Sequence, residues 1–180
     1  MSATTLGTWI CDRTTLTYYH SGSTSYLFHN MHSLSRFGKP IFLFQNFYLK
    51  STWGWDDETK RNELFAPESR HKSPPSLPVT SDDPCAFVHF RFEIDAGRPI
   101  LYCYEIQLHE KVRGFKLGRK LMDILLKISI DNRMSRILLT VFKFNTVACT
   151  FFRKLGFKID HTDPSKFGLC VDYSILSRRP

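Results

Sequence analysis

Residues 101–145, which begin LYCYEIQLHEKVRGFKLGRK and end LLTVFKFN, contain the pattern that decides the fold. The run Leu101–Leu108 is aromatic and aliphatic with one carboxylate, Glu105, and is typical of a buried or half-buried strand. A basic turn with two glycines follows, and from Leu117 apolar residues recur at helical spacing. Arg136–Phe142 is a second apolar run. Strand, helix and strand in one unit predict a pair of parallel or splayed strands.

The basic turn before the expected helix has a physical use. A helix N-terminus carries about half a positive charge and free N–H donors, and it therefore binds phosphate. Arg113, Lys116, Arg119 and Lys120 would add to this positive field. A solvated basic turn in front of an ordinary helix is the alternative, and the turn alone favours neither interpretation.

Six segments of the chain resemble one family. They are Trp53–Asp56 (WGWD), Phe87–Phe92 (FVHFRF), Leu101–Leu108, Leu139–Asn145 (LTVFKFN), Phe151–Arg153 (FFR) and Tyr173–Arg179 (YSILSRR). Together they resemble the GCN5-related N-acetyltransferase (GNAT) fold, and more closely the D-type N-terminal acetyltransferases that modify histone tails. The resemblance implies an α/β (α+β) fold, in which helices flank a central, twisted mixed sheet whose strands splay around an acetyl-CoA site.

The activity implied by this resemblance is acyl transfer. An acetyl group would pass from acetyl-CoA to the α-amine of a protein N-terminus, with histone tails that start Ser-Gly-Arg-Gly as substrates. The amine would attack the thioester directly, so no enzyme nucleophile is needed, and Cys103 is better interpreted as a small buried hydrophobe. Glu105, helped by Glu93, would accept the amine proton, and a backbone N–H near Gln107 or Leu108 would hold the thioester oxygen.

The family positions that contact the two substrates can be carried over residue by residue. Contact with the peptide N-terminus is implied for Tyr48, Trp53, Tyr104, Thr140, Thr162 and Tyr173. Contact with acetyl-CoA is implied for Gln107, Leu108, His109, Arg113, Phe115, Lys116, Leu117, Gly118, Arg119, Lys120 and Asn145.

A predicted hairpin places two carboxylates on adjacent strands. Residues 86–94 and 100–108 predict two strands joined by a turn at 95–99. We expect the hairpin to bring Glu93 and Glu105 near one another, and two carboxylates in a partly buried groove raise one pKa. A carboxylate with a raised pKa is a useful base near neutral pH. Two edge carboxylates matched by nearby arginines are the alternative.

One departure from the family lies in its cofactor signature, Arg/Gln-x-x-Gly-x-Gly/Ala. The chain has Arg113–Gly118 (RGFKLG), with Lys116 where the first glycine is usual. A Cβ at this position would narrow the approach to the pyrophosphate or oppose a positive φ, while the lysine charge would partly compensate. Two alternatives therefore stay open: a catalytically impaired acetyl-CoA-binding interaction protein, and an acetyltransferase for other amines.

The length of 180 residues and a hydrophobic content of 42% predict a single domain over 1–180. Residues 33–47 are interpreted as an atypical insert. Residues 65–80 are interpreted as a proline-rich loop, because prolines argue against a central strand.

Local patterns predict the smaller elements. We expect a strand around Leu16–Tyr19 and helical segments at 26–31 and 42–49. A short, solvated helix follows Asp56, and Asn145 is a natural N-cap for a helix that begins at Thr146.

Composition excludes several classes of function. Twenty-five basic and 17 acidic residues give a net charge of +8, but the basic residues are dispersed and no nucleic-acid module is present, so we expect no direct nucleic-acid contact. No apolar run approaches the roughly 20 residues of a membrane span, and the start lacks the pattern of a secretory signal. Five scattered cysteines show no metal spacing and favour reduced thiols. We expect a monomer without a metal, in the cytoplasm and nucleus.

Overall fold

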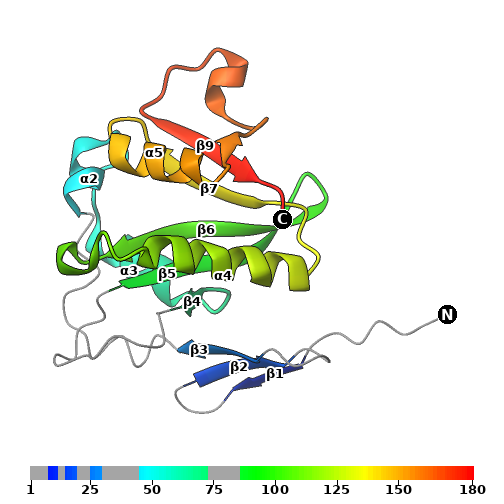
Figure 1. Cartoon of the computed structure of the whole chain (residues 1–180). Helices are drawn as coiled ribbons and strands as arrows, with labels where there is room; N and C mark the ends of the chain where they lie inside the picture. The colour runs from blue at the N-terminus through cyan, green and yellow to red at the C-terminus, as the bar shows by residue number, and fades with distance from the viewer. Residues whose placement is uncertain (1–7, 12–14, 20–24, 30–44, 73–85) are drawn as a thin grey trace.

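The computed structural model describes residues 8–11, 15–19, 25–29, 45–72 and 86–180 (Figure 1). The main body is a six-stranded sheet with the order β4-β5-β6-β7-β9-β8. Neighbouring strands are antiparallel except β6 and β7, which are parallel. The strands are β4 (Arg70–Lys72), β5 (Ala86–Asp95), β6 (Arg98–Leu108), β7 (Ile137–Phe142), β8 (Lys158–Ile159) and β9 (Tyr173–Arg178).

Helices flank this mixed sheet, as the sequence predicts. The longest, α4, lies across one face of β5 and β6, and α5 lies beside β7 (Figure 1). The helical elements are α2 (Gln45–Lys50), α3 (Asp57–Phe65), η2 (Glu110–Val112), α4 (Leu117–Asp131), α5 (Thr146–Lys154) and η3 (Pro164–Phe167). The α/β fold class, with an open mixed sheet, is therefore confirmed.

The hydrophobic core lies between α4, α5 and the sheet. One face of α4 is buried through Leu121, Leu125 and Ile128, while Arg119 and Lys120 on its other side are exposed. This is the apolar stripe that the spacing predicts. The sheet contributes Val88, Phe90, Leu101, Cys103, Ile137, Leu139, Val141 and Leu176 to the same cluster.

Strands β6 and β7 pair over only part of their length. Their register contains Leu101↔Ile137, Tyr102↔Leu138 and Cys103↔Leu139. Strand β6 continues to Leu108 and β7 continues to Phe142, but no further residues of the two strands pair. The two parallel strands therefore diverge beyond Cys103, which confirms the predicted splay and opens the centre of the sheet.

A β-bulge at Tyr104 decides which face of the sheet receives Glu105. His89 of β5 pairs with Glu105, and the next residue, Phe90, pairs with Cys103, so Tyr104 is the extra residue. Side chains alternate along a strand, and an extra residue shifts that alternation by one. Cys103 consequently points to the α4 core, whereas Glu105 points to the opposite face, where α3 lies.

Strands β1 (Thr8–Cys11), β2 (Thr15–Tyr19) and β3 (Ser25–His29) form a separate antiparallel sheet. Strand β2 confirms the predicted strand around Leu16–Tyr19. The helix predicted for residues 26–31 is wrong where the structure describes it, because β3 pairs along its whole length with β2. A short apolar and aromatic run does not distinguish a helix from a strand by its period.

The other expectations on the first half of the chain have mixed outcomes. Helix α2 overlaps the predicted helix at 42–49. The expectation of a loop over 65–80 is wrong for Arg70–Lys72, which pair with β5 as the outer strand β4. Because this position is at the edge of the sheet and contains no proline, the rule against prolines in central strands does not oppose it. Residues 33–44 and 73–80 lie outside the described residues.

Candidate active site

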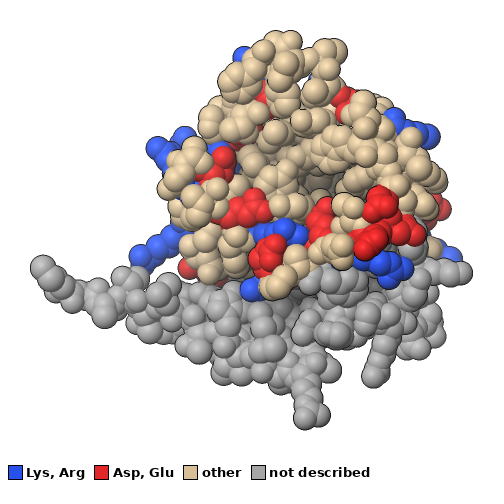
Figure 2. All heavy atoms as spheres, turned by 180° about the vertical axis from the view of Figure 1, so that it is seen from behind, with Lys and Arg blue, Asp and Glu red and all other residues tan. Residues whose placement is uncertain are grey.

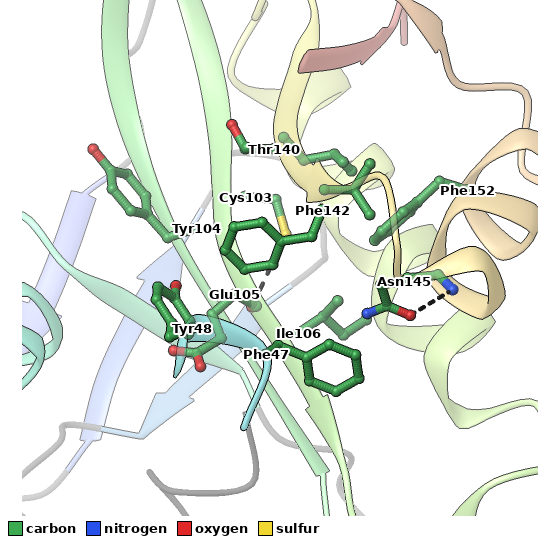
Figure 3. Close-up of a pocket in the computed structure, with 13 residues that line it drawn as sticks. Phe47, Tyr48, Cys103, Tyr104, Glu105, Ile106, Thr140, Phe142, Asn145 and Phe152 are labelled. Carbon is green, nitrogen blue, oxygen red and sulfur yellow. Dashed lines mark hydrogen bonds between the residues drawn. The ribbon is translucent and has the colours of Figure 1, made fainter. Parts of the chain in front are cut away.

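A pocket of about 110 Å³ lies where β6 and β7 diverge. Figure 3 shows residues of α2, β6, β7 and α5 converging on it, with the side chain of Glu105 next to that of Tyr48. Its walls are largely apolar and aromatic, with few polar groups. They are formed by Phe47, Tyr48, Cys103, Tyr104, Glu105, Ile106, Leu139, Thr140, Val141, Phe142, Asn145, Ala148 and Phe152.

A second pocket, of about 150 Å³, adjoins the first. Tyr48, Tyr104, Thr140 and Phe142 line both, and the second is completed by Trp53, Glu63 and Tyr102. Aromatic faces with one carboxylate suit an ammonium group, which aromatic rings attract electrostatically. On the face of the molecule opposite α4, Figure 2 shows acidic side chains gathered in a band beside a hollow, with some basic side chains among them.

Glu105 is the buried carboxylate of this site. Its side chain is only 4% exposed, and Gln107 Nε2 donates a hydrogen bond to its Oε1. Its Oε2 lies 3.4 Å from Lys60 Nζ. Burial raises the pKa of Glu105 above its ordinary value, although Lys60 and Gln107 oppose that rise. A carboxylate in this setting is a stronger base than an exposed one.

Lys60 is the partner that the sequence analysis missed. The short helix α3 is confirmed, with Asp56 Oδ1 accepting from Thr59 N at its N-cap, but Lys60 is not solvated. The residue is 4% exposed, and its Nζ lies 2.8 Å from Glu63 Oε1. The available signal is the spacing of Lys60, Glu63 and Leu64, which share one helix face. An apolar residue on that face is expected to be buried, and Leu64 is completely buried in the structure.

Glu93 does not lie beside Glu105, contrary to the expectation from the hairpin. The two residues are on adjacent strands, but Glu93 pairs with Ile100 and Glu105 pairs with His89. His89 and Glu93 are four positions apart along β5, which is about 13 Å in an extended strand. Glu93 instead accepts a hydrogen bond of 2.6 Å from Tyr104 Oη. The raised pKa of Glu105 therefore has its cause in burial, with a smaller contribution from Glu63 rather than Glu93.

Four of the six residues predicted to contact a peptide line the pockets: Tyr48, Trp53, Tyr104 and Thr140. Tyr173 packs against Trp53 with ring centroids 5.1 Å apart, and so lies next to the second pocket. Thr162 is not part of either lining, and its Oγ1 donates to Asp160 Oδ1 at 2.8 Å. Tyr102, which was not predicted, meets Thr140 Oγ1 at 2.7 Å through its hydroxyl.

The residues predicted to hold the cofactor lie at the end of β6, in the following turn and in the first turn of α4. Gly114 has φ +84° and Lys116 has φ +61°, so the turn uses the left-handed region twice. For Lys116 this is the positive φ that the missing glycine would adopt without strain. Arg113, Phe115, Lys116, Arg119 and Lys120 are exposed, whereas Leu117 and Gly118 are buried.

This turn fits a phosphate-bearing ligand. The first N–H groups of a helix have no partner within the helix, and those of α4 open toward a turn rich in cations. Gly118 lets α4 approach α5, because an added Cβ would lie 3.2 Å from Phe151 Cζ. His109 caps η2, and Leu108 O accepts from Arg113 Nε at 3.2 Å, which orders the turn.

Asn145 and Gln107 have internal roles as well. Asn145 Oδ1 accepts from Ala148 N at 3.2 Å, which confirms the predicted N-cap of α5, and the residue also lines the first pocket. The side chain of Gln107 is buried and directed at Glu105. Any contact between Gln107 and a cofactor therefore involves the backbone of Gln107, because its side chain is hydrogen-bonded to Glu105.

Cys103 is a core residue. It is 3% exposed, and burial together with the nearby Glu105 raises its pKa to about 12. A protonated thiol is a poor nucleophile. The expectation of a small buried hydrophobe is confirmed, and the residue offers no covalent route at neutral pH.

Two features are absent from the described residues. Among them, no three His, Cys, Asp or Glu side chains are grouped in a way that could hold a metal ion. In the same part of the chain, no helix is both long and apolar enough to cross a membrane.

Comparison with known proteins places this architecture in a family. The model of the acetyltransferase (GNAT) family matches residues 41–157, more than half of the chain. A crystal structure of Arabidopsis thaliana NAA60 with a bisubstrate analogue is similar, with a TM-score of 0.59 at 14% identity over 83% of this chain and 94% of that one. Two further structures share the fold. One is the PaiA N-acetyltransferase of Thermoplasma acidophilum with coenzyme A, with a TM-score of 0.56 at 13% identity over 84% of this chain and 93% of that one. The other is the NatC complex with Gag peptide and CoA, with a TM-score of 0.56 at 12% identity over 84% of this chain and 91% of that one. The chain belongs to the acetyltransferase (GNAT) family.

Proposed function

We propose that this chain transfers an acetyl group from acetyl-CoA to the α-amine of a protein N-terminus, and that histone tails starting Ser-Gly-Arg-Gly are its substrates. The observation that carries the proposal is the position of Glu105. A buried carboxylate with a raised pKa lines the first of two adjoining pockets, which lies between the diverging strands β6 and β7, and the second pocket is lined by aromatic rings, Glu63 and Thr140. The first suits the thioester and the second suits the amine.

The chemistry needs a base and an electrostatic support for the thioester oxygen. The amine nitrogen attacks the thioester carbon, the C–N bond forms, and the C–S bond breaks as the thiolate leaves and takes up a proton. Glu105 accepts the proton that the amine loses. Beyond Cys103, the edge of β6 that faces the cleft has no paired residue on β7, so its backbone N–H groups are available to the developing negative charge.

The preference for an α-amine follows from proton affinity. An α-amine has a reference pKa of about 7.7–8.0, against about 10.4 for a lysine side chain, so far more of it is unprotonated near neutral pH. The basic third residue of the proposed tail is favoured by the acidic band of Figure 2, which opposes the overall positive charge of the chain.

The cellular setting belongs to the same proposal. A histone tail is accessible in the cytoplasm before assembly and in the nucleus afterwards, so we expect the protein to act in both compartments. We further propose that it acts as a monomer, without direct contact to nucleic acid.

The test uses three peptides and localises the acetyl group by mass spectrometry. The first starts Ser-Gly-Arg-Gly with a free α-amine and contains an internal lysine. The second has the same sequence but a blocked N-terminus. The third has a free α-amine like the first, with glutamate in place of the arginine. The proposal expects acetylation of the α-amine in the first, none in the second and slower transfer in the third. Transfer to the lysine of the blocked peptide would overturn it in favour of an acetyltransferase for other amines.

Acetyl-CoA binding is measured separately by calorimetry. Binding without transfer to any of these peptides, in folded protein, would support an impaired interaction protein instead.

A further inference from the structure

Lys60 is an unusual residue for a short surface helix. Its neighbours on α3, Thr59 and Arg61, are exposed, whereas Lys60 itself is buried. Lysine is almost never fully buried unless it is paired. The side chain here crosses from α3 to the face of β6 that carries Glu105.

The ammonium of Lys60 is held by groups from three elements. Its Nζ lies 2.8 Å from Glu63 Oε1 on α3 and 3.4 Å from Glu105 Oε2 on β6. It donates to Tyr48 Oη of α2 at 3.2 Å, and it lies 5.0 Å from the centre of the Tyr48 ring. Burial alone would lower the pKa of Lys60, but Glu105, Tyr48 and Glu63 together raise it above the ordinary value. The ammonium is therefore charged.

We infer that Lys60 is a positioning residue for this reaction: its ammonium holds the Glu105 carboxylate ionised and directed at the cleft, while Glu63 competes for the same ammonium and so weakens that hold. The catalytic meaning of the inference rests on the proposed function, whereas the ion-pair geometry does not.

The two oxygens of Glu105 have different surroundings, and this difference favours the inference. Oε1 accepts the hydrogen bond from Gln107, which fixes the plane of the carboxylate. Oε2 has no hydrogen-bond partner among the described residues and faces only the longer contact to Lys60. Removal of the Lys60 ammonium would therefore leave the charge on this buried oxygen without a compensating cation nearby.

Other ionisable groups also face this network. His89 of β5 lies with its Nδ1 3.9 Å from Glu63 Oε1 and stacks on Tyr104, and the Cys103 thiol of β6 is close enough to Glu105 for the carboxylate to affect its pKa. Tyr48 of α2 is neutral, since burial raises its pKa. Arg91 of β5 also reaches this network, through the backbone oxygen of Glu63 and the ring of Tyr104. Among the described residues, Lys60 is thus the cation that lies within 4 Å of both the Glu63 and Glu105 carboxylates.

Two substitutions should shift the titration of Glu105 in opposite directions. Lys60→Met removes the cation but keeps the length of the side chain, and we expect it to move the Glu105 titration to higher pH by about one to three units. Glu63→Gln removes the competing anion, and we expect a shift to lower pH. General damage to the fold would move both variants in the same direction.

Titration is read directly by NMR, independently of activity. Protein labelled with ¹³C at glutamate carboxyl carbons is titrated, and the Glu105 resonance is assigned by its loss in Glu105→Gln. The acid limb of the kcat/KM profile is measured in parallel with the free-amine peptide. Lys60→Arg should restore most of the wild-type titration, and Arg61→Gln, which removes an exposed cation one residue away, should leave it unchanged.

The outcomes separate the two claims. Opposite shifts in the Glu105 resonance, with matching shifts in the acid limb, support the inference. Equal titration in Lys60→Met and wild type, or shifts of the same sign in both variants, overturns it. If Lys60→Met does not fold, Glu63→Gln and Lys60→Arg still decide the matter. Absence of peptide acetylation by the wild type would defeat the proposed function alone, because the carboxyl titration would still decide the role of Lys60.

Discussion

The side chain of Asn145 has two expected roles, one in stability and one in ligand binding, and substitutions can separate them. Its Oδ1 accepts from Ala148 N at 3.2 Å and caps α5, while the same residue lines the cleft between β6 and β7. Replacing an Asn cap by alanine costs about 1 kcal/mol of stability. For a chain of this length that corresponds to a fall in Tm of about 2–4 °C.

The matched variant is Asn145→Asp, which keeps the accepting oxygen and places a negative charge at the start of α5. That charge suits the helix dipole, so we expect the stability of Asn145→Asp to equal or exceed that of the wild type. The same charge opposes the approach of an anionic cosubstrate. We therefore expect a higher KM for acetyl-CoA in both variants, but a lower Tm only in Asn145→Ala.

Thermal unfolding followed by circular dichroism and steady-state kinetics with varied acetyl-CoA provide the two readouts. An alanine variant as stable as the wild type would refute the capping argument. An aspartate variant with an unchanged KM would refute contact between this residue and the cosubstrate.

Three further predictions concern the turn, the acid stability and the buried thiol. Gly114→Ala should lower the free energy of unfolding by about 1–2 kcal/mol in urea titrations, through backbone strain alone, since φ is +84° and an added Cβ meets nothing within 4 Å; unchanged stability would contradict this. Burial would raise the pKa of Asp163, but hydrogen bonds from Ser165 and from β9 lower it. The stabilisation by the Asp163 carboxylate is therefore present above the unfolded pKa of about 3.9 and is lost as the pH falls. Asp163→Asn should flatten the acid limb of the curve of Tm against pH. A variant curve that runs parallel to the wild-type curve would disprove this. At pH 8, iodoacetamide should modify the exposed Cys170 and spare Cys103 in native protein, as read by peptide mass spectrometry. Equal labelling of the two residues would show that the Cys103 thiol is not buried and protonated.

The centre of the fold could be predicted from the sequence because its signals are local and strong. Each element has its own signal: the helical spacing of apolar residues in α4, the N-cap residue Asn145 before α5, and the two apolar runs of β6 and β7. Together these signals allow only a parallel or splayed pair of strands. The N-terminal half lacked such signals. Residues 26–31 are apolar but short, and only pairing with a neighbouring strand decides between helix and strand.

The site was harder to predict than the fold, because its decisive contacts depend on register. A single extra residue, Tyr104, turns Glu105 away from the core. The distance between Glu105 and Glu93 follows from the hairpin register, in which Glu93 pairs with Ile100 near the turn and Glu105 pairs with His89 farther along β5. A bulge leaves no reliable mark in the sequence. Charged residues on a short helix are usually exposed, so the sequence predicts that Lys60 is solvated. Its burial follows from the partner carboxylates that the fold supplies.

The most direct test of the account is the effect of Glu105→Gln on the rate of α-amine acetylation. The substitution keeps the shape of the side chain and removes its ability to accept a proton. A general base contributes about 10²- to 10⁴-fold to a rate. The account therefore predicts a fall in kcat of at least 100-fold for the Ser-Gly-Arg-Gly peptide, with little change in the KM for acetyl-CoA, measured at a temperature at which circular dichroism shows the variant to be folded. A variant that retains more than a tenth of the wild-type kcat would contradict the central role given to Glu105.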